Sequence, residues 1–127
     1  MATVLQYNFV ASSEENGVLT VGFADAQFDT QEYLLFQRIV DWEEFRSDDD
    51  DEVYVERDGQ QYGTYGGIEK FVLSRNDALL LLIAETAEAL DTEQEVSIAF
   101  SATDEQFEKL KTDFGRVFAG EVDFELS

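Results

Sequence analysis

The chain has 127 residues and a formal net charge of -21 at pH 7, because 29 acidic side chains stand against 8 basic ones. This length suits one domain, residues 1–127, and the 44% of hydrophobic residues is enough for a folded core. The charge disfavours binding to nucleic acid or to an anionic membrane, because phosphate would be repelled, and it favours a basic protein partner.

Missing residue types exclude several chemistries. The chain has no cysteine and no histidine. Thiolate and imidazole metal ligands are therefore excluded, as is Ser-His-Asp or Cys-His catalysis. The sequence shows no secretory signal, and its longest purely apolar run, 78–84, cannot span a bilayer. We expect a cytoplasmic protein without a cofactor, a metal site or catalytic residues.

Alternating apolar and polar residues predict strands in the first forty residues. Residues 4–11 and 18–24 both alternate, on either side of the turn dipeptide Asn16-Gly17. Two such runs around a turn predict a β-hairpin or a loose meander. The nearly continuous apolar run 33–40 predicts a strand that is buried on both faces, with a helix as the alternative.

A second hairpin is predicted around Asp58-Gly59, because a dipeptide of this type favours a two-residue type I′ turn. Such a turn places Val55 opposite Tyr62. It leaves Tyr54 and Glu56 on the other face of the hairpin, toward solvent.

Glycine and turn residues divide the next part of the chain. Gly66-Gly67 permits a sharp change of direction before a strand over 68–74. A central strand over 78–83, a short helix over 84–90 and a half-buried strand over 95–100 are predicted to follow.

The last predicted element is an amphipathic helix. Thr103 and Gln106 form a capping box at its start, and Gly120 suits the position after its end. Gly115 lies inside the helix, where glycine costs about 1 kcal/mol relative to alanine. The apolar stripe, with a period of 3.6 residues, consists of Phe107, Leu110, Phe114, Val117 and Phe118.

Together these elements predict an α+β fold. We expect a mainly antiparallel β-sheet of about seven to eight strands, connected as hairpins or a meander. One short helix accompanies the sheet, and the C-terminal amphipathic helix packs on it.

The acid-rich stretch 41–58 holds ten carboxylates and two arginines together with large aromatic residues. Carboxylates attract a basic partner and rings anchor it, so this mixture predicts an interaction surface. Trp42 and Phe45 as core residues, and Tyr54 as an ordinary surface residue, are the alternatives. The predicted partner-binding residues are Trp42, Glu43, Glu44, Phe45, Asp48, Asp49, Asp50, Asp51, Tyr54 and Glu56.

Three other interpretations of the acidic residues concern metal, salt and catalysis. The run 48–52 suggests calcium, but it lacks the alternate-position spacing and the central glycine of an EF-hand. Adaptation to high salt would spread the acids evenly, whereas they cluster in 41–58. Paired carboxylates act as acid and base in glycosidases, but among 29 acids such a pair carries little information. We expect no enzyme.

Several segments resemble a known family. Residues 33–38 are similar to its tyrosine-leucine strand that ends in Gln-Arg. Residues 53–56 and 62–69 resemble its central hairpin with the Tyr-Gly-Gly-Ile-Glu stretch, and 73–75 also fit. The family is immunity protein 10, found beside bacterial polymorphic toxins, and the resemblance covers about residues 22–120.

The resemblance implies a non-enzymatic protein that binds and neutralises a cognate toxin, often a nuclease, inside the producing cell. It supplies no catalytic residues. For the Gly66-Gly67 stretch, the resemblance implies a role in maintaining the fold. The alternative is an acidic interaction or regulatory module, such as a nucleic-acid mimic, for another basic partner.

Overall fold

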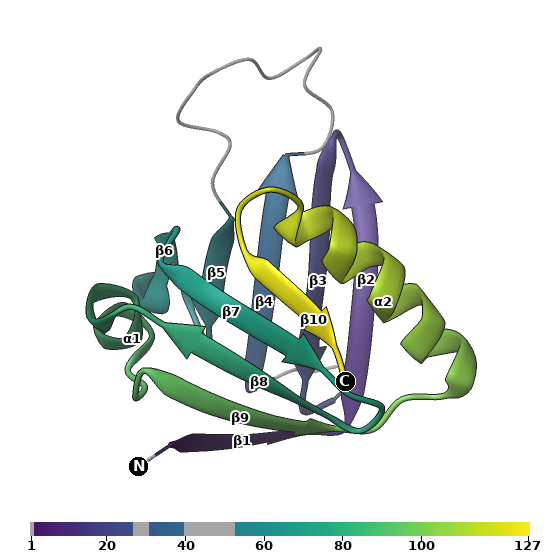
Figure 1. Cartoon of the computed structure of the whole chain (residues 1–127), viewed down its shortest axis with the longest axis horizontal. Coiled ribbons are helices and arrows are strands. Elements are labelled where there is room, and N and C mark those ends of the chain that lie inside the picture. The colour runs from purple at the N-terminus through teal and green to yellow at the C-terminus, as the bar shows by residue number, and fades with distance from the viewer. Residues whose placement is uncertain (1, 27–30, 40–52) are drawn as a thin grey trace.

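The computed structural model describes residues 2–26, 31–39 and 53–127. In these ranges ten strands form two five-stranded sheets, accompanied by two α-helices (Figure 1). Sheet A has the strand order β1 (Thr3–Tyr7), β9 (Glu95–Phe100), β8 (Asp77–Leu82), β7 (Ile68–Leu73) and β10 (Asp123–Leu126). Sheet B has the order β2 (Phe9–Glu15), β3 (Val18–Ala24), β4 (Tyr33–Ile39), β5 (Tyr54–Arg57) and β6 (Gly63–Tyr65).

Neighbouring strands are antiparallel except at the two edges of sheet A, where β1 runs parallel to β9 and β10 parallel to β7. The predicted α+β class with mainly antiparallel pairing is therefore confirmed. The described residues hold ten strands in two sheets, where about seven to eight in one sheet were predicted.

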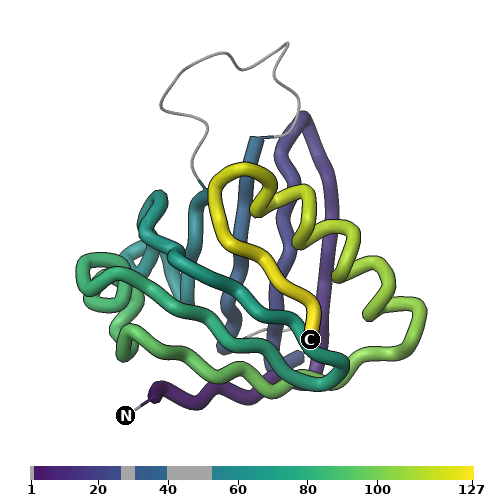
Figure 2. Tube along the Cα trace, in the orientation of Figure 1, coloured from purple at the N-terminus to yellow at the C-terminus, as the bar shows by residue number. Residues whose placement is uncertain are grey.

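The first predicted run contains two strands that belong to different sheets (Figure 2). β1 ends at Tyr7 in sheet A, whereas β2 begins at Phe9 and forms a hairpin with β3 in sheet B. Leu5 and Tyr7 are buried but Phe9 is 39% exposed, because the chain changes sheets at Asn8. The predicted turn at Asn16-Gly17 is confirmed, and its φ angles of 53° and 79° fit type I′.

The core lies between the inner face of sheet B and a second layer, in which sheet A and α2 (Asp104–Phe118) lie side by side (Figure 1). α2 contacts β2, β3 and β4 of sheet B, and β10 of sheet A. One aromatic ring from sheet B, one from sheet A and one from α2 meet at the centre of the core. Phe36 of β4 lies 5.6 Å from Phe71 of β7 and 5.6 Å from Phe114 of α2, measured between ring centroids. Burial of these large rings joins the three parts.

α2 begins and ends as predicted. The Gln106 amide donates to Thr103 Oγ1 at 3.1 Å, and the Thr103 amide donates to Gln106 Oε1 at 2.8 Å, which completes the capping box. Gly120 follows the helix with a φ of 77°. Phe107 is only half-buried. The buried members of the predicted stripe are Leu110, Phe114, Val117 and Phe118. No helix in the described ranges is long and apolar enough to cross a membrane.

The Gly66-Gly67 bend contacts the start of α1 (Ala84–Leu90). The bounds of α1 match the predicted short helix. Both glycines have positive φ angles, 74° and 84°. The Thr86 hydroxyl donates to the Gly66 carbonyl at 3.1 Å, and the Ile83 amide donates to the Gly67 carbonyl at 2.9 Å. A Cβ on Gly67 would overlap the Thr86 side chain. Backbone conformation and close approach therefore both require glycine here.

The predicted two-residue turn at Asp58-Gly59 is wrong. A 3-10 helix, η2 (Gln60–Tyr62), follows the dipeptide, so Val55 lies opposite Thr64 and the register shifts away from the predicted one. Glu56 was predicted to face solvent, yet it is 8% exposed because tyrosine side chains cover it.

β4 is a strand, as predicted, but it is not buried on both faces. Leu34 and Phe36 point into the core and are fully buried. Leu35 and Gln37 point the other way and stay half-buried, because their face of sheet B points away from the core.

Candidate interaction surface

The outer face of sheet B carries Tyr54 and Glu56, the two predicted partner-binding residues that the structure describes. Strand register brings outward-pointing residues of all five strands into rows. One row consists of Ala11, Gly22, Leu35, Glu56 and Gly63. The next row consists of Ser13, Thr20, Gln37, Tyr54 and Tyr65. We call the outward-pointing residues of β2–β6 the open face, and none of those described is a lysine or an arginine.

Two tyrosines of the open face donate hydrogen bonds to Glu56, and a third tyrosine packs against one of them. The Tyr54 hydroxyl donates to Glu56 Oε1 at 2.6 Å, and the Tyr33 hydroxyl donates to Oε2. The ring of Tyr65 lies 4.9 Å from the ring of Tyr54, and Tyr65 is 62% exposed. A Cβ on Gly63 would overlap the Tyr54 hydroxyl, so glycine at this position gives the ring its room. We call Tyr33, Tyr54, Glu56 and Tyr65 the tyrosine–glutamate cluster.

The carboxylate of this cluster has no cationic neighbour in the part of the chain that the structure describes. No described lysine or arginine forms an ion pair with Glu56. The two phenols satisfy it as a hydrogen-bond acceptor but do not neutralise its charge. Burial, and then the hydrogen bond to Glu56 and the charge of Glu56, raise the pKa of Tyr33 and of Tyr54 to about 12. Both phenols therefore stay protonated at neutral pH and keep donating.

A groove of about 340 Å³ adjoins the cluster on the open face. Tyr33 belongs to both, because it lines the groove and also bonds Glu56. Gly22 forms part of the groove, and a Cβ there would overlap the Leu34 carbonyl oxygen. Since most of its other lining side chains are small, the groove can accept an apolar side chain of a partner.

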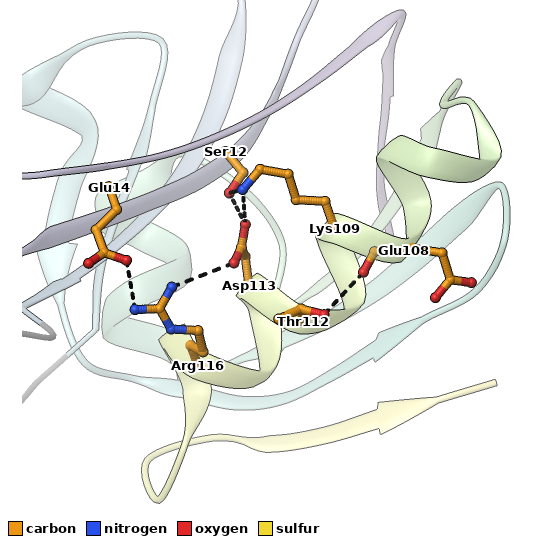
Figure 3. Close-up of polar contacts among 7 residues, drawn as sticks. All are labelled: Ser12, Glu14, Glu108, Lys109, Thr112, Asp113 and Arg116. Atoms are coloured by element: carbon orange, nitrogen blue, oxygen red, sulfur yellow. Dashed lines mark hydrogen bonds and ion pairs between the residues drawn. The ribbon is translucent and has the colours of Figure 1, made fainter.

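A second buried carboxylate, Asp113, joins α2 to β2 (Figure 3). Its Oδ2 accepts from Lys109 Nζ at 2.8 Å and from the Ser12 hydroxyl. Its Oδ1 lies 3.8 Å from Arg116, which also pairs with Glu14 at 2.7 Å. Burial alone would raise the pKa of Asp113. The hydrogen bonds from Lys109 and Ser12 and the charges of Lys109 and Arg116 outweigh burial and lower this pKa. We call these five residues the Asp113 cluster.

All seven described basic side chains have partners within the fold. Arg38 donates to carbonyl oxygens at the C-terminal end of α2, and Arg57 to those at the end of α1. Such positions favour positive charge because of the helix dipole. No sequence pattern indicated these two contacts. Arg57 also lies 3.6 Å from an Asp58 carboxylate oxygen. The other residues that pair with carboxylates are Lys70, Arg75, Lys109, Lys111 and Arg116.

The structure brings Tyr54 and Glu56 together and adds Tyr33 and Tyr65, which the sequence indicated only as strand residues. The register across β4, β5 and β6 makes this cluster, and no local pattern reveals it. The remaining predicted contact residues lie outside the described residues: Trp42, Glu43, Glu44, Phe45, Asp48, Asp49, Asp50 and Asp51. Among the described residues, no group of three or more acidic side chains is placed to hold a metal ion.

Comparison with known proteins gives one match. The family model described as immunity protein 10 matches residues 5–108, more than half of the chain. The match runs from β1 into α2 and includes the whole of sheet B. No curated protein and no solved structure matches the chain.

Proposed function

Because the chain belongs to the immunity protein 10 family, we propose that it binds a cognate bacterial toxin and neutralises it in the cytoplasm of the producing cell. The family match over residues 5–108 is the observation that carries this proposal. The protein acts by occupying the toxin and performs no catalysis of its own.

The proposed partner is a basic protein. The net charge of -21 attracts a cationic toxin, and a nuclease fits because its substrate channel must attract phosphate. Long-range attraction of this kind raises association rates by about 10 to 10³-fold. The described basic side chains do not oppose it, because each is engaged by a carboxylate or by the end of a helix.

The proposed contact surface combines the acid-rich stretch with the open face. Residues 41–52 directly precede β5, which contributes Tyr54 and Glu56 to the open face. In this proposal the run 48–51 accelerates association. Trp42, Phe45 and Tyr54 slow dissociation, because buried rings dominate the stability of protein complexes.

The test is protection of a host cell from the toxin. A candidate toxin is sought among large proteins encoded beside this chain. It is expressed with and without the chain, and growth and the dissociation constant of the purified pair are measured. We expect restored growth and nanomolar or tighter binding. Raising the salt concentration from about 0.05 to about 0.5 M should slow association at least tenfold, because screening removes the long-range attraction. Neither protection nor binding at low salt would overturn the proposal.

A matched pair of variants separates the acid-rich stretch from net charge. Changing Asp48, Asp49, Asp50 and Asp51 to Asn removes four charges from the stretch. Changing Glu85, Glu88, Glu93 and Glu95 to Gln removes four charges from exposed positions around α1 and β9. We expect the first variant to slow association several-fold more than the second. Equal effects would show that net charge alone attracts the partner.

A further inference from the structure

Glu56 is the buried carboxylate among the described residues of the open face, and its oxygens are satisfied although no described cation neutralises it. Its two oxygens accept from Tyr54 and Tyr33, and only 8% of the residue is exposed. A buried charge without a counter-ion is costly, so folded proteins pair such groups. Asp113 follows this rule, with Lys109 and Arg116 beside it. Glu56 does not follow it among the described residues.

The side chains that cover Glu56 lie at the surface of the protein. Tyr33 and Tyr54 are half-buried, whereas Tyr65 is 62% exposed with its ring 4.9 Å from that of Tyr54. A phenol that donates to a carboxylate gains electron density in its ring, which strengthens the attraction of the ring for a cation. The half-buried ring of Tyr54 and the exposed ring of Tyr65 therefore present the charge of Glu56 to an incoming group.

We propose that Tyr54, Tyr65 and Glu56 form a socket for an arginine side chain of the toxin. This inference rests on the proposed function. A guanidinium ion fits better than an ammonium ion, because its plane stacks on the rings while its N–H groups donate toward the carboxylate. Its charge supplies the counter-ion that Glu56 does not find among the described residues, and no described lysine or arginine of the open face competes with it.

The groove gives the toxin a second point of attachment beside the socket. Tyr33 lines the groove and bonds Glu56, so the two features are continuous. An apolar side chain next to the arginine would fill the groove. The expected partner segment therefore carries an arginine close to an apolar residue, and this spacing gives specificity beyond net charge.

The socket is tested with a defined small probe, N-acetyl-argininamide, and with the isosteric neutral N-acetyl-citrullinamide as its control. The tyrosine ring and glutamate carboxyl resonances of the whole protein are followed by NMR during titration. We expect the arginine probe to shift Tyr54, Tyr65 and Glu56 with a dissociation constant on the order of 10 mM. The citrulline probe should leave them unchanged. Equal shifts with both probes, or arginine shifts that avoid these residues, would overturn the proposal.

Variants identify the source of the affinity. Glu56→Gln should weaken arginine binding about tenfold, because the amide keeps the size of the side chain and removes its charge. Glu88→Gln, which removes the same charge from an exposed position, should leave it unchanged. Tyr65→Ala tests the exposed ring, and Tyr62→Ala on η2 is its control, because Tyr62 is also exposed. Unaltered arginine binding in both Glu56→Gln and Tyr65→Ala would overturn the socket.

The two proposals can fail separately. The probe needs no toxin, so a socket that does not bind arginine is rejected even where the chain protects cells. Conversely, failure of the chain to bind or protect against the toxin rejects the proposed function, whatever the probe shows. If the toxin is bound equally well by wild type and by Glu56→Gln, the immunity function stands and the socket does not carry it.

Discussion

Two buried carboxylates lie on opposite sides of sheet B, and their surroundings differ. Asp113 on α2 faces the inner side of β2 and has Lys109, Arg116 and the Ser12 hydroxyl around it. Glu56 on the open face has the phenols of Tyr54 and Tyr33 and no described cation. Both are satisfied as hydrogen-bond acceptors, but of the two only Asp113 is neutralised by cations in the described ranges.

This difference separates a group that holds the fold from a group suited to binding. A neutralised buried carboxylate stabilises the contact between two elements, here α2 and β2. A carboxylate that lacks a cation costs free energy in the isolated protein, and a partner that supplies the cation recovers this cost. Substitution of Asp113 should therefore change the free energy of unfolding, whereas substitution of Glu56 should change the binding of a cationic partner.

Asp113→Ala should give the largest loss of stability, about 2–3 kcal/mol in urea unfolding, because charged hydrogen bonds between α2 and β2 disappear. Lys109 and Arg116 are 59% and 44% exposed at the side chain, so water solvates them afterwards and limits the loss. Glu108→Ala is the control. Glu108 is 69% exposed and pairs only with Lys111 among the described residues, so we expect less than about 0.5 kcal/mol. Equal losses would contradict a structural role for the Asp113 cluster.

Acid pH tests the same cluster. Because the pKa of Asp113 is lowered in the folded state, its contribution is present above the unfolded value of about 3.9 and is lost as pH falls through the folded value. As pH falls through that acid range, the free energy of unfolding of Asp113→Asn should therefore decrease less than that of wild type.

Gly115→Ala should stabilise α2 by about 1 kcal/mol, because alanine is the better helix former. A Cβ at this position would lie 3.9 Å from Phe124 Cε2, an ordinary contact, so no steric cost opposes the gain. The substitution lies on the helix of the Asp113 cluster and away from the open face. Thermal unfolding should shift upward while binding of the arginine probe stays unchanged. A loss of stability would show that Phe124 cannot accommodate the methyl group.

Elements with local signals could be predicted from the sequence. The capping box of Thr103 and Gln106 marks the start of α2, and Gly66-Gly67 marks the bend before β7. Each signal acts within a few residues, so distant parts of the chain do not alter it. β8, α1 and β9 followed the predicted periodicity for the same reason.

Features that depend on pairing between distant segments could not be predicted. Nothing at Asn8 marks the change from sheet A to sheet B, because both strands alternate in the same way. β10 forms because it pairs in parallel with β7. The residues of β10 are few, and their own sequence does not indicate that pairing. The tyrosine–glutamate cluster requires the register set by η2, which replaced the predicted two-residue turn.

Alkaline pH should weaken the fold through Tyr33 and Tyr54. The pKa of each is raised to about 12, above the unfolded value of about 10, first by burial and then by the hydrogen bond to Glu56. Their contribution is fully present below pH 10 and is lost as pH rises toward 12. Ultraviolet titration should show these two phenols ionising late in wild type, together with Tyr7, whose pKa burial also raises. Tyr33 and Tyr54 should ionise earlier in Glu56→Gln, which removes the acceptor charge. Tyr62→Phe, away from the cluster, should leave the late phase intact.

Glu56→Gln should produce the smallest change in stability, within about 0.5 kcal/mol of wild type. Two opposing terms nearly cancel. The amide has one accepting oxygen, so it accepts from only one of the two phenols and less strongly than a carboxylate does. It also removes a buried charge that no described cation compensates. Urea unfolding of Glu56→Gln beside Asp113→Asn gives the comparison, since both changes replace a buried carboxylate by its amide. A loss of 2 kcal/mol or more at Glu56 would place it with Asp113 as a structural carboxylate. A loss near zero, together with weakened arginine binding, would show that its charge serves the partner and not the fold.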